Sequence, residues 1–252
     1  MRRLFTQTAI VVAMGSLIAG CGSSSHLIKP EKVEDKTWVL TSVNGAPPVD
    51  STRVTMSIKP VNSEQGRISG QGPCNRYFGG YKVEGKKNIS FTPMGSTMMA
   101  CPSEMMQEEK DYLANFEKVN QMTMNKNMLV LKDSDGRVNM TYGLETGRVK
   151  GRIESTSGGF PADSQVIVRL QDVSLANNSR ASIIGMETIK LKDAVLGSVP
   201  FDIAYAPQLV QPGKNYAVYV QVMNKGKVIY TTTARHKIKL DPVHTGKASR
   251  KS

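Results

Sequence analysis

Apolar and polar side chains alternate through most of this chain, which is the pattern of strands that bury one face. In the first half, Val54, Met56 and Ile58 recur at every second position. The same period returns in three later runs: Val166, Val168 and Leu170; Tyr216, Val218, Val220 and Val222; Ile238 and Leu240. Turn-forming pairs such as Asn44-Gly45 and Pro212-Gly213 separate the runs. The pattern predicts a mainly β protein.

One segment of the first half has a helical period instead. Its apolar residues are spaced for one face of a helix: Met105, Met106, Tyr112, Leu113, Phe116 and Val119. Ser103, which follows Pro102, is a favourable N-cap. The neighbouring acids Glu108 and Glu109 are expected to be solvated on the polar face. We therefore predict a single helix here.

The N-terminus has the pattern of an export signal. Arg2 and Arg3 precede an apolar stretch, Ala9 to Gly20, that is too short to span a bilayer as a helix. The stretch ends in Leu17-Ile18-Ala19-Gly20-Cys21, which resembles the lipobox of bacterial lipoproteins. We predict a lipoprotein signal peptide over residues 1–20, acylation of Cys21 and a flexible tether over residues 21–33. An ordinary secretory signal with an incidental cysteine is the alternative.

Acylation would fix both the membrane partner and the compartment. Each methylene of a buried acyl chain contributes about 0.8 kcal/mol to membrane attachment. Residue 22 is Gly rather than Asp, which by resemblance to the sorting rules of Gram-negative lipoproteins implies the outer membrane. The expected location is therefore lipid-anchored, on the periplasmic face of that membrane.

Positive charge is concentrated in the second half of the chain. The whole chain has 33 Lys+Arg against 21 Asp+Glu, a formal net charge of +12. Residues 34–146 hold equal numbers of acids and bases, so the excess belongs mainly to residues 147–242 and to a basic tail over residues 243–252. A single nucleic-acid patch spanning the protein is not supported, and we expect no nucleic-acid partner.

Three of the basic residues are candidates for partner binding. Arg235, Lys237 and Lys239 would project from one side of a strand. Such a stripe could meet anionic lipid headgroups or an acidic segment of a partner protein. An ordinary solvated face, on which lysines prevent edge-to-edge aggregation, is the alternative.

Cysteine usage favours a structural disulfide. If Cys21 is acylated, Cys74 and Cys101 remain as an even pair in an oxidising compartment. A catalytic thiol would need a base, and the three histidines, His26, His236 and His244, lie outside residues 34–146. We predict a Cys74–Cys101 disulfide.

Methionine is enriched on both sides of Cys101, at Met98, Met99, Met105 and Met106. We favour adaptable core packing as the reason for this enrichment. A Cu(I) site is the alternative, because thioethers are soft ligands. We predict no resident metal.

Motifs of common enzymes are missing from the sequence. It has no nucleophile elbow, P-loop or helical His-Glu motif. Gly70-Gln71-Gly72 lacks the third glycine of a dinucleotide site. We expect no enzymatic activity and no cofactor.

Two motifs of the first half resemble a known family. The run Gly72-Pro73-Cys74-Asn75-Arg76-Tyr77-Phe78-Gly79-Gly80-Tyr81, then Ser96 to Cys101 and an acidic helix, are similar to the META domain of HslJ-like envelope proteins. The resemblance covers residues 34–146 and implies a compact β-barrel-like fold with one helix. It implies no agreed catalytic residues, because members are associated only with heat shock, drug tolerance or virulence.

The second half resembles another family. Val149-Lys150-Gly151, residues 166–174, Pro200 to Ile203 and Tyr216 to Val220 are similar to the YbaY/YscW-type lipoprotein domain. The resemblance spans residues 148–241, and we predict that the domain itself covers residues 147–242. The resemblance implies that this domain is a β-sandwich. The family includes pilotins, which bind a secretin subunit and carry it to the outer membrane.

These observations predict a non-enzymatic outer-membrane lipoprotein with two β domains. Its expected role is to bind or chaperone an envelope protein, such as a secretin, or to support envelope stress tolerance. The alternative is a periplasmic protein that binds a small hydrophobic ligand inside the META barrel.

Overall fold

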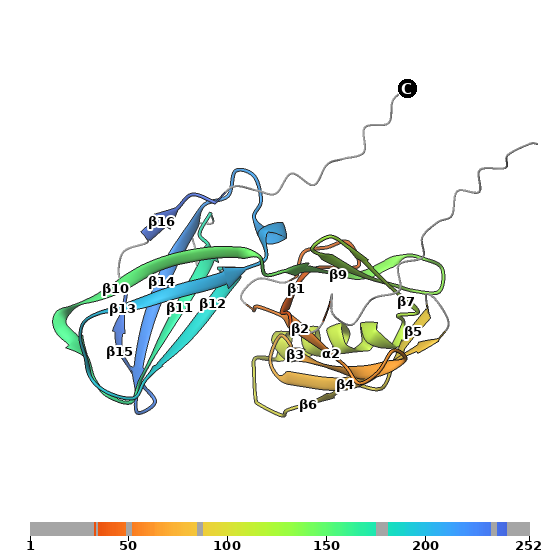
Figure 1. Ribbon diagram of the computed structural model, residues 1–252, viewed down its shortest axis with the longest axis horizontal. Helices are drawn as coiled ribbons and strands as arrows, with labels where there is room; N and C mark the ends of the chain where they lie inside the picture. Colours follow the sequence, from red (N-terminus) through yellow and green to blue (C-terminus); the bar gives the residue numbers. More distant parts are fainter. Residues whose placement is uncertain are drawn as a thin grey trace, which may run out of the picture.

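The computed structural model describes residues 33, 35–48, 52–84, 88–174, 181–232 and 236–240. These residues form two lobes, each built on one antiparallel sheet (Figure 1). The prediction of a mainly β fold with two domains and one main helix is confirmed. None of the helices in these ranges combines the length and apolar character that crossing a bilayer requires.

The N-terminal lobe is a closed barrel with a helix. Its elements are β1 (Trp38–Val43), β2 (Thr55–Pro60), β3 (Gln65–Gln71), β4 (Arg76–Glu84), β5 (Asn88–Phe91), β6 (Gly95–Ser96), α2 (Ser103–Glu117), β7 (Gln121–Asn125), β8 (Met128–Lys132) and β9 (Val138–Leu144). The strand order is β3-β2-β1-β9-β8-β7-β5-β4-β6. Because β3 also pairs with β4, every strand except β6 belongs to a closed ring.

The helix lies between the walls of this barrel (Figure 1). Tyr112 and Phe116, four residues apart, are buried in the barrel core together with Tyr77 of β4. The expected apolar face is therefore confirmed at these two positions. It is wrong at Met106, which is exposed, because the buried face runs through Glu109, Tyr112 and Phe116.

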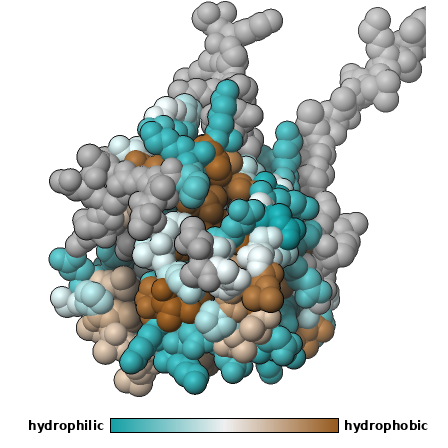
Figure 2. Space-filling model, turned by 90° about the vertical axis from the view of Figure 1, so that its left-hand side faces the viewer, coloured by the Kyte–Doolittle hydropathy of each residue, from teal (hydrophilic) through white to brown (hydrophobic). Residues whose placement is uncertain are grey.

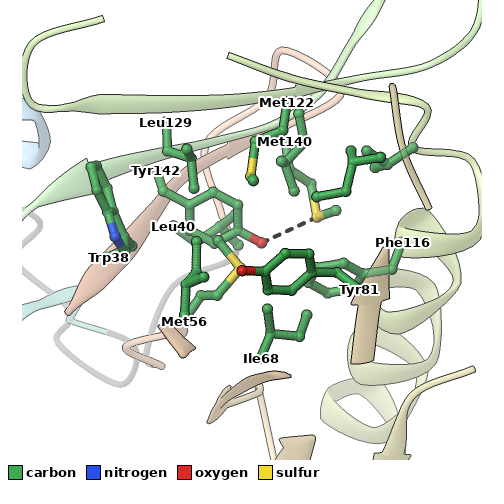
Figure 3. Close-up of a cluster of buried hydrophobic side chains, with 14 of the residues drawn as sticks. Trp38, Leu40, Met56, Ile68, Tyr81, Phe116, Met122, Leu129, Met140 and Tyr142 are labelled. Carbon is green, nitrogen blue, oxygen red and sulfur yellow. Dashed lines mark hydrogen bonds between the residues drawn. The ribbon is translucent and has the colours of Figure 1, made fainter. Parts of the chain in front are cut away.

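A chain of phenols crosses the apolar interior. The Tyr77 hydroxyl donates to the Thr55 carbonyl at 2.9 Å, and the Tyr112 hydroxyl lies 2.9 Å from that of Tyr77 and 3.0 Å from that of Tyr142. Figure 3 shows Tyr142 among the core side chains, with its hydroxyl directed at the Met140 sulfur. Burial raises the pKa of all three phenols. The three phenol hydroxyls brought into the core thus have hydrogen-bond partners within it.

The C-terminal lobe is an open sheet of seven strands. Its elements are β10 (Gly147–Phe160), β11 (Ser164–Asp172), β12 (Ile183–Leu191), β13 (Val195–Tyr205), the short helix η2 (Pro207–Leu209), β14 (Tyr216–Asn224), β15 (Lys227–Thr231) and β16 (His236–Ile238). The order is β10-β13-β12-β11-β14-β15, and β16 pairs with the other end of β14. In the part of the chain that the structure describes, β10 at one end of the sheet pairs with neither β15 nor β16 at the other.

The alternating residues of this lobe face one shared core. Val166, Val168 and Leu170 of β11 are buried against alternate residues of β14 and against Val199 and Ile203 of β13. One continuous sheet therefore covers its core from more than one side, as the walls of a sandwich would.

Candidate functional site

A groove opens in the C-terminal lobe between β10 and the β14–β15–β16 end of the sheet. Its volume is about 360 Å³. It is lined by Ile153, Glu154, Ser155, Phe160, Val220, Val222, Tyr230, Thr231, Thr232 and His236. The floor is apolar, because Phe160, Val220 and Val222 belong to the buried core of the lobe. The groove is thus a place where the lobe core reaches the surface between two ends of one sheet.

An irregular stretch of β10 forms the first wall. The register of β10 against β13 shifts between Glu154 and Gly159, so several residues of β10 bulge away from the ladder. Gly158 has φ +95°, in the region that favours glycine. Bulges of this kind bend an edge strand and interrupt its pairing. Regular pairing resumes at Gly159, and the ring of the next residue, Phe160, is directed back into the core.

Strand β15 forms the opposite wall. Tyr230 sits opposite Val222 in the ladder, and its ring lies edge-on to that of Phe160 with 6.5 Å between the centroids. The Thr232 hydroxyl accepts from the Val220 N–H at 3.0 Å. Two aromatic rings thus meet across the groove. At its far end, the backbone and the hydroxyl of Thr232 are hydrogen-bonded to the backbone of Val220 in β14.

The outer surface of this wall is also apolar. All five residues of β15 are exposed, and Val228, Ile229 and Tyr230 are among them. Figure 2 looks at the lobe from this side and shows apolar residues placed between hydrophilic ones. No described strand pairs with the outer edge of β15. An unpaired apolar edge beside a groove is a surface suited to another chain.

The predicted basic residues lie beside the groove in part. Lys237 and Lys239 are exposed, whereas Ile238 and Leu240 pack against the lobe core. His236, which lines the groove, starts the same short strand. Arg235 and the acylation site Cys21 lie outside the described residues, so their roles stay predictions.

The predicted cysteine pair is joined in the structure. A disulfide connects Cys74 and Cys101, with 6.1 Å between their Cα atoms. It ties the loop before β4 to the segment before α2. The neighbouring Asn75 accepts at Oδ1 from the Met99 N–H at 2.7 Å and from the Thr97 hydroxyl at 3.0 Å. The motif around Cys74 therefore joins the turn before β4 to the stretch between β6 and α2 at several points.

Glu109 corrects the expectation that both acids of the helix are solvated. Its side chain is buried, and the residue is only 6% exposed. One carboxylate oxygen accepts from the backbone N–H groups of Cys74 (3.0 Å) and Asn75, and the other accepts from the Asn75 side-chain amide at 2.9 Å. The carboxylate thus accepts hydrogen bonds from N–H groups of the turn that have no partner in a neighbouring strand.

The methionine cluster also differs from expectation. Met98 is 98% exposed, and Met99 and Met106 are exposed as well. Core packing explains Met56, Met122 and Met140, which are buried, but it does not explain these three. Among the described residues, no group of three His, Cys, Asp or Glu side chains is placed to hold a metal ion.

Comparison with known families agrees with this two-lobe description. Residues 31–145 match the family model of the META domain. Residues 145–248 match the family described as the type III secretion system lipoprotein chaperone, YscW. The chain therefore carries a META domain followed by a YscW-type domain, and the two resemblances seen in the sequence are confirmed in that order. No curated protein matches the chain.

Two solved structures are similar to part of the chain. An alternative pilotin from the type II secretion system of Vibrio cholerae is 24% identical over 38% of this chain and 85% of its own, with a TM-score of 0.35. A protein from Burkholderia xenovorans, solved by NMR, is 20% identical over 58% of this chain and 100% of its own, with a TM-score of 0.36.

Proposed function

We propose that this protein is a non-enzymatic lipoprotein chaperone of the outer membrane. Its C-terminal lobe would bind a segment of an envelope protein, such as a secretin, in the groove between β10 and β15. The acyl group on Cys21 would keep the bound protein at the periplasmic face of the membrane. The family description of a secretion-system lipoprotein chaperone supports the class of function.

The groove is the observation that carries the proposal. Its floor is made of core residues, so a partner's apolar side chains would continue the packing of the lobe rather than meet a polar surface. The adjacent edge of β15 offers backbone groups that could pair with an extended segment. Exposed Lys237 and Lys239 nearby would favour acidic residues around the partner's apolar ones.

The alternative of a hydrophobic ligand inside the META barrel is less well supported. The barrel interior holds a continuous cluster of buried side chains that includes Tyr77, Phe116, Leu131 and Tyr142. Helix α2 contributes part of this cluster. A ligand would have to displace packed aromatic rings, which costs several kcal/mol.

A crosslinking experiment in intact cells tests the proposal. A photoreactive amino acid replaces Tyr230 in the groove in one strain and Val138, an exposed residue of the barrel, in the other. We expect an adduct with one exported protein from the first position only. Equal labelling from both positions, or none from Tyr230, would contradict the groove as the binding site.

A charge placed in the groove provides the matched functional test. Tyr230→Asp should abolish the adduct or weaken partner binding at least ten-fold, because it puts an unpaired carboxylate against an apolar floor. Met186→Asp introduces the same charge at an exposed apolar residue of β12, which belongs to neither the groove nor the edge of β15. Full partner binding by the Met186 variant is the expected control result.

A further inference from the structure

The outer wall of the barrel carries a second surface that the proposed function does not use. A shallow basin of about 880 Å³ lies over β2, β3, β4 and β5. Its basic residues are Lys59 of β2, Arg67 of β3 and Lys82 of β4, and all three are exposed. We call this surface the basic basin. It belongs to the N-terminal lobe, whereas the groove belongs to the C-terminal lobe (the two lobes are seen in Figure 1).

The sheet register brings these cations together. Lys59 is directly opposite Arg67, and Arg67 is directly opposite Gly80. Directly opposite residues have Cβ atoms about 5 Å apart. Lys82 lies two residues from Gly80 on the same strand and therefore on the same face. Arg67 and Lys82 thus lie next to Gly80, where the sheet has no side chain, and Lys59 lies beyond Arg67.

The other walls of that position are suited to a phosphate-bearing ligand. The Thr92 hydroxyl accepts from the Gly80 N–H at 2.8 Å, so Thr92 closes the side opposite Arg67. Phe78 lies two residues from Gly80 along β4 and is 59% exposed. Val61, which directly follows β2 and is two residues from Lys59, is 65% exposed. Cations and exposed apolar side chains thus share one surface.

Stability does not account for this arrangement. Like charges directly opposite in a sheet destabilise it, yet Lys59 faces Arg67. Among the described residues, no ion pair involves Lys59, Arg67 or Lys82, and Glu84 is the one acid within β2, β3, β4 and β5. The domain as a whole has equal numbers of acids and bases, with acids gathered on α2. The four strands β2 to β5 therefore carry more basic than acidic side chains.

We infer that the basic basin binds the phosphate groups of anionic phospholipids and holds the META barrel against a bilayer surface. Arg67 can form paired hydrogen bonds with a phosphate, while Lys59 and Lys82 supply further positive charge. Phe78 and Val61 would enter the boundary between headgroups and acyl chains, where exposed apolar residues gain free energy. The barrel would then have a membrane contact of its own, independent of the acyl group on Cys21.

Vesicle binding by a form of the protein that begins at Gly22 tests this inference. This form lacks both the leader and the acylated Cys21, and it keeps both lobes whole. Vesicles of phosphatidylethanolamine and phosphatidylglycerol are compared with vesicles of phosphatidylcholine alone. Each basic residue near an anionic bilayer strengthens binding roughly five-fold. The triple variant Lys59→Gln, Arg67→Gln and Lys82→Gln should therefore bind the anionic vesicles on the order of 100-fold more weakly.

A matched variant separates the basin from net charge. Lys110→Gln, Lys118→Gln and Lys126→Gln remove the same charge from exposed positions elsewhere on the same lobe. Binding within about three-fold of wild type is expected for this control, because charges away from the bilayer are screened. An equal loss in both triple variants would overturn the inference, and so would anionic-vesicle binding that the basin variant leaves unchanged.

Insertion of Phe78 gives an independent readout. Trp38 is the only natural tryptophan and is fully buried. In Phe78→Trp, brominated phospholipids should quench the added indole on binding, whereas the wild-type emission from Trp38 should stay unchanged. Inorganic polyphosphate supplies the soluble alternative. If it binds through the same three cations and no indole quenching accompanies vesicle binding, the ligand is a free phosphate compound and the membrane inference is wrong.

Discussion

The two lobes use the same strand chemistry but differ in how their sheets end. In the N-terminal lobe, β3 pairs with β4 and closes a ring around packed aromatic and aliphatic side chains. In the C-terminal lobe, β10 and β15 remain as separate ends, and core residues line the groove between them. Closure completes the internal packing, whereas the open sheet keeps apolar surface available for another chain. The comparison teaches that closure of the sheet completes a core, whereas an open sheet leaves the groove in which we propose that a partner binds.

High pH should distinguish the lobes most strongly. Burial raises the pKa of Tyr77, Tyr112 and Tyr142 above the ordinary value of 10.0. As pH rises above that value, the phenols ionise in the unfolded chain but stay protonated in the folded barrel. Unfolding then releases protons, so the barrel's stability falls by about 1.4 kcal/mol per pH unit for each phenol, or about 4 kcal/mol for three.

Urea titrations followed by Trp38 fluorescence, in steps above pH 10, would measure this slope, since Trp38 is buried in the barrel. Tyr112→Phe should remove roughly a third of it. In the C-terminal lobe, burial raises the pKa of Tyr216, which is also buried, and this single phenol should give a shallower dependence by hydrogen exchange. Equal slopes in the two lobes would show that the buried phenols are not responsible.

Loss of the disulfide should affect the barrel alone. The bond closes a loop with a sequence separation of 27 residues. Cys74→Ser with Cys101→Ser should lower the free energy of unfolding of the barrel by roughly 3–4 kcal/mol in the chain-entropy model. Hydrogen exchange measured lobe by lobe should show faster exchange in β1 to β9 and unchanged protection in β11 and β14. Faster exchange throughout would mean that the lobes unfold as one unit.

Replacing the buried carboxylate of Glu109 tests how much its hydrogen bonds to Cys74 and Asn75 stabilise the barrel. Glu109→Gln keeps one acceptor oxygen but places its amide donor against other donors, either the Asn75 side-chain amide or the backbone N–H groups of Cys74 and Asn75. The free energy of unfolding should therefore fall by about 2 kcal/mol. Glu108→Gln changes the same charge at the preceding residue and should cost less than about 0.5 kcal/mol. Thermal melts of the two variants provide the measurement, and equal losses would contradict the role given to Glu109.

Only a small stability change is expected from a substitution in the groove. Tyr230→Asp should alter the free energy of unfolding of the C-terminal lobe by less than about 1 kcal/mol, because Tyr230 is already 38% exposed. Its effect should fall on partner binding instead. A large loss of protection in β14 by hydrogen exchange would show that Tyr230 belongs to the structural core and not to a binding surface.

The sequence predicted the elements better than it predicted the sites. Period-two runs such as Val166, Val168 and Leu170 revealed strands, because alternation directly reports a buried face. The burial of Glu109 gave no such signal, since its partners Cys74 and Asn75 are more than thirty residues away in the chain. An acid in a helix has the same pattern whether it faces water or a turn.

The groove was hidden from the sequence for a similar reason. Phe160 and Tyr230 come from strands at opposite ends of the sheet order, and only the bending of that sheet brings their rings together. Local alternation explains why both positions are apolar. It does not reveal that the two ends of the sheet remain unpaired with each other, which depends on the overall curvature.

The short connection between the lobes has a mechanical consequence. Only Glu145 and Thr146 separate β9 of the barrel from β10 of the groove, and the Arg53 side chain pairs with Glu145 at this junction. A bound protein that pulled on the groove would load β9 along its axis. That strand is hydrogen-bonded to β1 on one side and β8 on the other, so the tension would be shared between two ladders before the barrel could yield.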